Sequence, residues 1–203
     1  MSKEHHIAIL IMAAGASSRM KAIKQLLPWG KTTLIGNALE HAQNSRATTV
    51  LIVLGAYGQE IKQATDLSGT ATIHNPNWKM GLGNSISCGT DQLLKLDEKY
   101  DGILVMLTDQ PLINEQYLNK LISNFSNSLH SIVATKYKNR VGVPAIFGKK
   151  HFKALLELNS DFGARDIIES HLNEVLSLSA DGKEVDVDTL EAYERVKKNL
   201  ESG

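Results

Sequence analysis

The sequence has little cysteine and no excess of either charge. Its 203 residues include one cysteine, Cys88, which excludes a disulfide framework within the chain and a metal site built on several thiolates. Lysine plus arginine equals aspartate plus glutamate at 22 each, so the formal net charge is zero. Proteins that hold nucleic acid usually carry a basic excess, so we expect no nucleic-acid partner.

A long hydrophobic run is also missing near the start of the chain. The apolar stretch there extends only from Ile7 to Met12, whereas a membrane-spanning helix needs about 20 residues. No signal-peptide cleavage pattern follows it. We therefore expect a cytoplasmic protein with no membrane partner. The seven histidines show neither HxH nor HExxH spacing, and we interpret each as a surface or core histidine.

Short apolar runs alternate with segments of helical periodicity along the chain. Strands are predicted at Ile7–Ala14, Thr48–Gly55, Thr70–His74, Gly102–Leu107, Ser131–Thr135, Val143–Phe147 and Val175–Leu178. Helices are predicted at Thr32–Asn44, Gln59–Thr65, Ser85–Leu96, Glu115–Phe125, Lys150–Leu158, Ala164–His171 and Leu190–Leu200. Continuously apolar strands that alternate with helices are typical of a mainly parallel sheet covered on both faces.

The predicted fold class is therefore α/β, a single doubly wound domain of Rossmann-like type over residues 1–203. The region from about residue 130 is less regular, and we expect an antiparallel excursion there that borders the substrate pocket. In open α/β sheets, ligands bind beyond the carboxyl ends of the strands. Three polar or glycine-rich segments fall at such ends: Gly15–Lys24, Asn75–Ser85 and Thr108–Pro111.

The first of these segments places small residues ahead of two cations. Small residues let backbone N–H groups approach phosphate oxygens closely. Arg19 offers a planar fork for phosphate oxygens, and Lys24 offers a point charge. The residue types alone leave two interpretations open, a phosphate-binding loop or a flexible surface loop with solvated cations. The small residues concerned are Ala13, Ala14, Gly15, Ser17 and Ser18.

Two familiar glycine motifs are excluded by single residues. Gly30-Lys31-Thr32 would end a P-loop only if a glycine stood at position 25, which is Gln25. That stretch instead predicts a turn followed by Thr32 or Thr33 as a helix cap. Gly81-Leu82-Gly83 has Ile86 where a dinucleotide fingerprint needs its third glycine. A glycine turn before Asn84 and Ser85 suits either a nucleotide's ribose or base, or a plain capped turn.

Asp109 stands at the end of the most hydrophobic predicted strand, and Pro111 blocks continuation of the ladder. A carboxylate there suits Mg²⁺, which prefers one or two carboxylates together with phosphate oxygens and waters. The competing interpretation is an aspartate that caps the next helix.

Five segments resemble, in the same order, the motifs of nucleotidyltransferases with a sugar-nucleotide-transferase-like fold, and most of all the molybdenum cofactor cytidylyltransferase family. They span nearly the whole chain, and the joint pattern is specific although each piece alone is weak. The segments are Leu10–Met20 followed by Lys24, Leu107–Leu112, Gly142–Pro144, Asp161–Arg165 and Val185–Thr189.

The resemblance implies a role for each matched position. The backbone of Ala13–Ser18 would cradle the nucleotide, and Arg19 and Lys24 would neutralise its triphosphate. Asp109 would bind Mg²⁺, and Asp188 would be the second carboxylate, with Asp186 as the alternative. Gly83 and Ser85 would border the ribose or base, and Gly142, Pro144 and Arg165 would shape the acceptor pocket.

The implied reaction is Mg²⁺-dependent transfer of CMP from CTP to the terminal phosphate of molybdopterin, with release of pyrophosphate. The Ala13-Ala14-Gly15 form of the first loop resembles the cytidylyl branch, whereas the guanylyl branch usually has a second glycine there. The implied partners are CTP, a molybdopterin-type phosphorylated acceptor, and a molybdenum hydroxylase apoenzyme that receives the product.

The sequence departs from the family pattern at two places. Lys21 stands where the family has glycine, and Leu190 and Ala192 stand where the last motif usually has proline and aspartate. Without that proline, Asp188 or Thr189 would have to cap the last helix. Three alternatives remain open: GTP as the donor, a sugar or polyol phosphate as the acceptor, and a carrier that binds molybdopterin without catalysis.

Overall fold

Seven strands form one sheet in the described part of the chain, in the order β5-β4-β1-β6-β8-β7-β9. The computed structural model describes residues 5–17, 20, 22–96, 99–159, 161 and 163–201. The strands are β1 (Ile7–Ala13), β4 (Thr49–Leu54), β5 (Ala71–His74), β6 (Gly102–Leu107), β7 (Ile132–Lys136), β8 (Val141–Gly148) and β9 (Val175–Ser179). A separate ribbon pairs β2 (Pro28–Trp29) with β3 (Thr32–Thr33).

The sheet is mainly parallel, as the alternation of strands and helices predicts. Strand β1 pairs in parallel with β4 and β6, β4 with β5, and β7 with β9. Only β8 runs the other way among these strands, antiparallel to both β6 and β7. The antiparallel strand that the sequence predicts after residue 130 is therefore confirmed, whereas its expected place at the substrate pocket stays a prediction.

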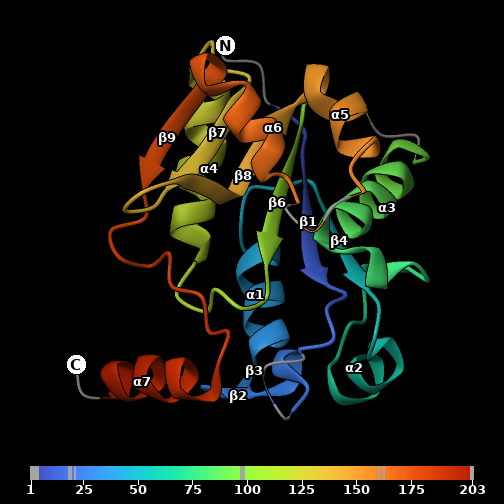
Figure 1. Ribbon diagram of the computed structural model, residues 1–203, viewed down its shortest axis with the longest axis vertical. Helices are drawn as coiled ribbons and strands as arrows, with labels where there is room; N and C mark the ends of the chain where they lie inside the picture. The colour runs from blue at the N-terminus through green and yellow to red at the C-terminus, as the bar shows by residue number, and fades with distance from the viewer. Residues whose placement is uncertain are drawn as a thin grey trace.

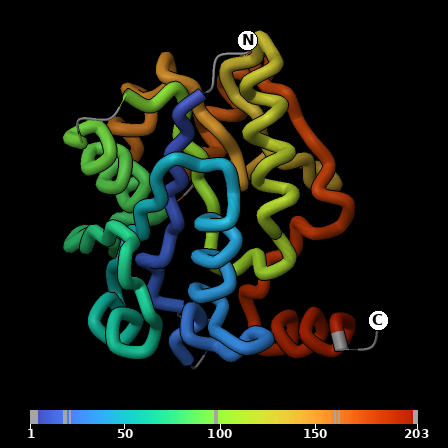
Figure 2. The backbone as a smooth tube through the Cα atoms, turned by 180° about the vertical axis from the view of Figure 1, so that it is seen from behind, coloured from blue at the N-terminus to red at the C-terminus, as the bar shows by residue number. Residues whose placement is uncertain are grey.

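Helices cover both faces of the sheet (Figure 1). On one face lie α1 (Leu34–Gln43) and α4 (Glu115–Asn127), and the short helix α2 (Gly58–Ala64) adds Ile61 to the same core. On the other face lie α3 (Leu82–Leu94), α5 (Phe152–Leu156) and α6 (Arg165–Ser170). The last helix, α7 (Leu190–Glu201), lies apart from the sheet, near β2 and β3, in both ribbon and tube views (Figures 1 and 2).

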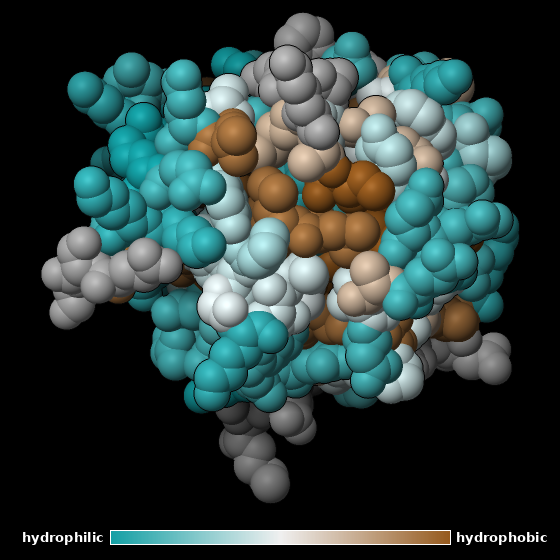
Figure 3. All heavy atoms as spheres, turned by 90° about the horizontal axis from the view of Figure 1, so that it is seen from below, coloured by the Kyte–Doolittle hydropathy of each residue, from teal (hydrophilic) through white to brown (hydrophobic). Residues whose placement is uncertain are grey.

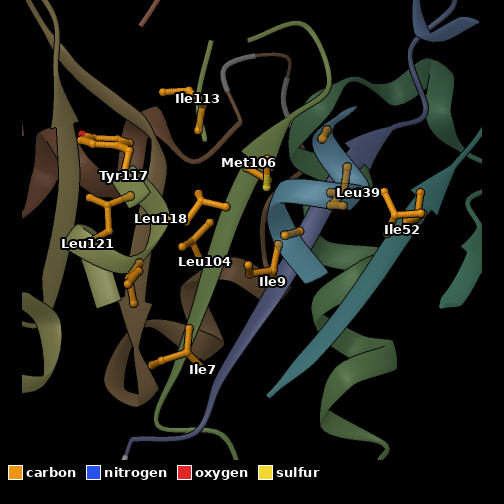
Figure 4. Packing of buried hydrophobic residues seen from close by; sticks show 14 of the residues in the cluster. Ile7, Ile9, Leu39, Ile52, Leu104, Met106, Ile113, Tyr117, Leu118 and Leu121 are labelled. Carbon is orange, nitrogen blue, oxygen red and sulfur yellow. The ribbon is translucent and has the colours of Figure 1, made fainter. Parts of the chain in front are cut away.

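The central strand β1 explains why its sequence is continuously apolar. All seven of its residues are buried, because their side chains alternate between two cores. Ile7 and Ile9 pack against residues such as Leu39 and Leu118 on one face (Figure 4), whereas Leu10 packs into the core of the other face. This burial fixes the position of the strand's carboxyl end.

Several helix starts differ from the sequence prediction by one to three residues, and two of these differences, in α1 and α3, bear on the candidate site. Helix α1 begins at Leu34 rather than Thr32, because the side chain of Thr33 caps it by accepting a hydrogen bond from Gly36 N at 3.2 Å. Helix α3 begins at Leu82 rather than Ser85, so the predicted glycine turn is wrong at Gly83, which lies in the first helical turn. Gly81 precedes that helix with a φ of 102°, a left-handed value that favours glycine.

Short 3₁₀ turns complete the fold at Lys24–Leu26 (η1), Trp78–Met80 (η2), Lys149–His151 (η3) and Leu172–Glu174 (η4). Among the described helices, none has the length and apolar character needed to cross a membrane.

Candidate active site

A cavity of about 430 Å³ opens where β1 and β6 end. Viewed toward this edge of the sheet, hydrophobic side chains gather near the middle of the face and hydrophilic ones surround them (Figure 3). Met12, Met20, Leu82 and Leu107 supply apolar lining, and Lys24, Lys79, Asp109, Asp161 and Asp188 supply charge. An apolar floor with converging charged groups is typical of a small-molecule site.

Lys24 joins two carboxylates that are far apart in the sequence. Its Nζ lies 2.6 Å from Asp109 Oδ2 and 2.9 Å from Asp188 Oδ1. The side chains of Lys24 and Asp109 are 14% and 15% exposed, and that of Asp188 is 38% exposed. The tertiary structure therefore brings together three of the residues predicted to hold the triphosphate and its metal.

The pKa of Lys24 reflects two opposing influences. Burial is the largest single influence and disfavours the charged ammonium. The Coulomb attraction of Asp109, with hydrogen bonds to Asp109 and Asp188, outweighs it and raises the pKa above the ordinary 10.5. Lys24 is therefore a fixed cation at neutral pH, as phosphate binding requires.

Other side chains make capping hydrogen bonds at the starts of the helices that follow Asp109 and Asp188. Asn114 caps α4, since its side chain accepts from Tyr117 N at 3.1 Å. Thr189 caps α7 by accepting from Ala192 N at 3.2 Å. The interpretation of Asp109 as the cap of α4 is therefore wrong, and both aspartates line the cavity.

A backbone hydrogen bond joins the two segments that carry Asp109 and Asp188. Val187 N donates to Asp109 O at 2.8 Å, so the segment before α7 is attached to the loop after β6. Val187 is fully buried, in a small core with Trp29, Leu34 and Tyr193. Packing of Val187, one residue away, therefore helps to position Asp188, together with the ion pair between the Asp188 side chain and Lys24.

The loop after β1 borders the same cavity. Gly15, Ser17 and Ala14 line it, and Ser17 has a φ of 52°, unusual for a residue other than glycine. Ala13 is buried at the end of the strand. Ser18 and Arg19, predicted to bind phosphate, lie outside the described residues.

The start of α3 forms the opposite wall. Ser85 lines the cavity, and its hydroxyl accepts from Asn75 Nδ2 at 3.0 Å. Gly83 is buried in the same helical turn and does not line the cavity among the described residues. Asp161 lies directly against Gly81: a Cβ atom added to Gly81 would be only 2.2 Å from Asp161 Oδ1.

The residues predicted to shape the acceptor pocket lie on β8 and α6, outside the described cavity lining. Gly142 packs near Tyr137 and Arg140, and the carbonyl of Pro144 accepts from Thr135 Oγ1 at 2.7 Å. Arg165 is half-exposed and pairs with Glu169 on its own helix, Nε to Oε1 at 2.6 Å. From the segment Asp161–Arg165, it is Asp161 that reaches the cavity.

Asp186 occupies a neighbouring polar cluster rather than the Lys24 pair. Gln110 Nε2 donates to Asp186 Oδ1 at 2.8 Å and to Tyr137 Oη at 2.5 Å. Arg140 lies 3.5 Å from Asp186 and stacks over the Tyr137 ring, 4.3 Å from its centroid. Burial, with a smaller contribution from Asp109, raises the pKa of Asp186 despite the Gln110 hydrogen bond.

Comparison with known proteins places the chain in a family. Residues 9–175 match the MobA-like NTP transferase domain. The chain belongs to this family. It is accordingly a nucleotidyltransferase, and its central sheet with helices on both faces is the nucleotidyltransferase fold that the sequence predicts.

Two relatives are similar to this chain over nearly their whole length. The chain is 27% identical to the purine catabolism protein PucB of Bacillus subtilis, over 94% of this chain and 96% of that protein. It is also 27% identical to nicotine blue oxidoreductase of Paenarthrobacter nicotinovorans, over 92% and 94%. A shorter match, 33% identity over 81 residues, is to molybdenum cofactor cytidylyltransferase of Escherichia coli and covers 39% of this chain and 42% of that one.

A solved structure, Rv0371c of Mycobacterium tuberculosis, is similar over 97% of this chain and 99% of that protein, with a TM-score of 0.85 and 28% identity. A second structure of Rv0371c is a complex with manganese, with a TM-score of 0.80, 28% identity, and coverage of 95% and 98%.

The donor set of this nucleotidyltransferase fits a divalent cation that shares its ligands with a substrate. Asp109 Oδ1 is buried and has no hydrogen-bond partner among the described residues, although its other oxygen pairs with Lys24. The described residues contain no group of three or more histidine, cysteine, aspartate or glutamate side chains that could hold a metal. Two carboxylates, completed by phosphate oxygens and water, are the pattern that Mg²⁺ prefers.

Sequence reasoning did not give a role to Gln25, Trp78 or Lys79, which also line the cavity. Trp78 and Lys79 follow Asn75-Pro76, within a segment that the sequence does mark as the end of a strand. Gln25 carries no such signal, because it is separated from β1 by a loop and its contacts are formed only in the folded chain.

Proposed function

We propose that this nucleotidyltransferase transfers CMP from CTP to the terminal phosphate of molybdopterin, giving molybdopterin cytosine dinucleotide and pyrophosphate. The observation that most directly supports this proposal is that Asp109 and Asp188 both pair with one cation, Lys24, beside the loop after β1. Two carboxylates and a lysine at one point are what a metal-bound triphosphate needs.

The choice of donor and acceptor rests on similarity. The match to the Escherichia coli molybdenum cofactor cytidylyltransferase supports molybdopterin as acceptor and CTP as donor. The Ala13-Ala14-Gly15 form of the loop supports the cytidylyl branch. One relative is named as an oxidoreductase, but Ile86 replaces the third glycine of a dinucleotide fingerprint here.

The chemistry requires alignment and charge neutralisation more than proton transfer. A phosphomonoester has a second pKa of about 6, so the acceptor's phosphate is already anionic near neutral pH. One of its oxygens forms a bond to the α-phosphorus of CTP, and the bond from that phosphorus to the bridging oxygen breaks. The electron pair leaves with pyrophosphate. No general base is needed, and the described residues that line the cavity include no histidine.

The chain's own residues supply the electrostatics. Lys24 neutralises phosphate charge from inside the cavity, and Lys79 adds a second cation at its wall. Mg²⁺ held by Asp109 and Asp188 would stabilise the charge of the triphosphate and of the leaving pyrophosphate. The manganese complex of Rv0371c supports a divalent cation in this family. Arg19, which lies outside the described residues, stays a predicted phosphate ligand.

Pyrophosphate release tests the proposal. Purified protein, Mg²⁺ and molybdenum-loaded molybdopterin are incubated with CTP, GTP, ATP or UTP in separate reactions, with Asp109→Asn as the inactive control. Selective release with CTP is the expected result. Selective release with GTP would reassign the donor. No release with any nucleotide from folded protein, but release with a sugar or polyol phosphate, would overturn the acceptor.

The product's destination is a further part of the proposal. A molybdopterin dinucleotide has to be delivered to an enzyme that uses it, and a molybdenum hydroxylase apoenzyme is the partner that fits. Addition of such an apoenzyme to a completed reaction should restore its activity only when CTP was supplied.

A further inference from the structure

Gln25 is a buried polar residue against the loop after β1. It lies in η1, between Lys24 and Leu26, and only 3% of it is exposed. Its side chain lines the cavity beside Lys24. A buried amide is unfavourable unless its hydrogen bonds are formed, so its partners show what holds it there.

Those partners belong to the end of β1 and the loop that follows it. Gln25 Nε2 donates to Ala13 O at 3.2 Å and to Gly15 O at 2.9 Å. Gln25 Oε1 accepts from Ser17 Oγ at 3.2 Å, and Ser17 Oγ accepts in turn from Lys24 N at 3.3 Å. Two carbonyl acceptors on one side and a hydroxyl on the other fix which end of the amide is the nitrogen.

The two carbonyl contacts determine where the loop's N–H groups point. In a planar trans peptide, the C=O and the following N–H point in opposite directions. Because Ala13 O and Gly15 O face Gln25, the N–H groups of Ala14 and Ala16 point away from it. Both of these residues line the cavity. The third contact holds Ser17 in its left-handed conformation, with φ at 52°.

We propose that Gln25 is a positioning residue that holds Ala13–Ser17 in the shape that receives the triphosphate. It acts through the backbone of that loop and contacts no reacting atom. The inference rests on the proposed function only in taking this cavity as the nucleotide site; it is independent of which acceptor is used. The proposal also gives a reason for a glutamine at this buried position. An apolar residue would fill the same space without the cost of burying an amide, but it could not hold the loop by hydrogen bonds.

Nucleotide binding to the full chain tests the proposal by calorimetry, with Mg²⁺ and CTP, and with GTP as a second probe. Gln25→Met keeps the length of the side chain and removes its hydrogen bonds. Gln25→Glu keeps the shape and turns a carboxylate toward two carbonyl oxygens. We expect the dissociation constant to rise about tenfold in Gln25→Met, as for the loss of one or two hydrogen bonds, and further in Gln25→Glu.

Thr135→Val is the matched control, because it removes another buried hydrogen bond to a backbone carbonyl, Pro144 O, away from the cavity. It should lower the melting temperature without a change in nucleotide affinity. A purely structural role for Gln25 would reduce the number of binding sites per protein and leave the dissociation constant of the folded fraction unchanged. That result, in both Gln25 variants, would overturn the proposal.

Steady-state kinetics add a second readout. We expect the KM for nucleotide to rise in Gln25→Met while the KM for the acceptor stays unchanged; equal changes in both would contradict a role confined to the nucleotide loop. If the wild type binds nucleotide but transfers nothing to molybdopterin, the acceptor assignment fails and the binding test of Gln25 still holds. If the wild type binds no nucleotide, both proposals fall.

Discussion

Lys24 Nζ lies 2.6 Å from Asp109 Oδ2, although the two residues are 85 positions apart in the chain. The same ammonium lies 2.9 Å from Asp188. The cation that we expect to meet phosphate is therefore held by the two carboxylates that we expect to hold a metal.

Asp109→Asn should lower turnover by about 100-fold or more, because it removes a carboxylate from the electrostatic centre of the reaction. The change is isosteric, so the fold should persist, which circular dichroism would show. Pyrophosphate release measures the turnover. Asp91→Asn, an exposed aspartate paired with Lys95, is the control. Retention of most activity in Asp109→Asn would remove Asp109 from the mechanism.

Lys24→Met should make the stability of the folded protein depend more strongly on divalent cations. Without the ammonium, the largely buried Asp109 loses the charge of its Lys24 partner, which we expect to cost about 3 kcal/mol of unfolding free energy. Added Mg²⁺ or Mn²⁺ should then raise the melting temperature more in this variant than in wild type, since the cation replaces the lost charge. Lys79→Met, which lines the same cavity, is the control. Equal metal-dependent shifts in all three proteins would contradict the shared site.

Asp188→Asn and Asp186→Asn should separate the two candidates for the second carboxylate. Only Asp188 pairs with Lys24, whereas Asp186 pairs with Gln110 and Arg140. We expect at least a tenfold larger loss of kcat in Asp188→Asn, as for a charged group at a metal-bound phosphate. The measurement is kcat at saturating Mg²⁺ and nucleotide. The reverse order would make Asp186 the ligand.

Val187→Ala should lower both the stability of the protein and its apparent affinity for Mg²⁺, through the position of Asp188. Val187 is fully buried and its backbone N–H holds Asp109 O, so its side chain fixes the path of the chain into Asp188. The smaller side chain should cost about 1–2 kcal/mol of unfolding free energy, measured in urea. The apparent affinity for Mg²⁺ in the reaction should also fall, because Asp188 is less well positioned. A loss of stability with unchanged metal dependence would show that Asp188 is held by other contacts.

His151 should make the protein less stable as the pH falls below about 6.5, the ordinary pKa of histidine. Burial is the largest cause of its lowered pKa, and neighbouring His171 and Lys150 add to it, whereas Glu174 opposes it. Above that pH the ring is neutral in both folded and unfolded chains, and the stability is complete. Below it the unfolded chain takes up a proton first, so unfolding becomes more favourable.

The unfolding free energy at about pH 7.5 and about pH 5.5 measures this effect, because that interval contains the ordinary histidine pKa. His151→Gln, which cannot gain a proton, should show a smaller difference between the two pH values than wild type. Glu174 should contribute little to this difference, because hydrogen bonds from Lys150 and Ser131 lower its pKa to about 2, well below the pH interval measured. An undiminished pH dependence in the variant would assign it to other groups.

The architecture and part of the candidate site follow from the amino-acid sequence alone. Continuous apolar runs such as Ile7–Ala13 indicate strands buried on both faces, and their alternation with helices predicts the mainly parallel sheet. A parallel sheet places its binding edge at the carboxyl ends of the strands, so Asp109 and the loop after β1 could be found from local signals alone.

Which of the candidate groups meet depends on the tertiary structure. The pairing of Lys24 with Asp188 and the hydrogen bonds of Gln25 to the end of β1 and the loop after it are contacts that no local sequence signal specifies. Gly81, which precedes helix α3, lies against Asp161, a residue far along the chain. Periodicity reports which face of an element is buried, but the partner of a polar side chain is set by packing across the whole domain.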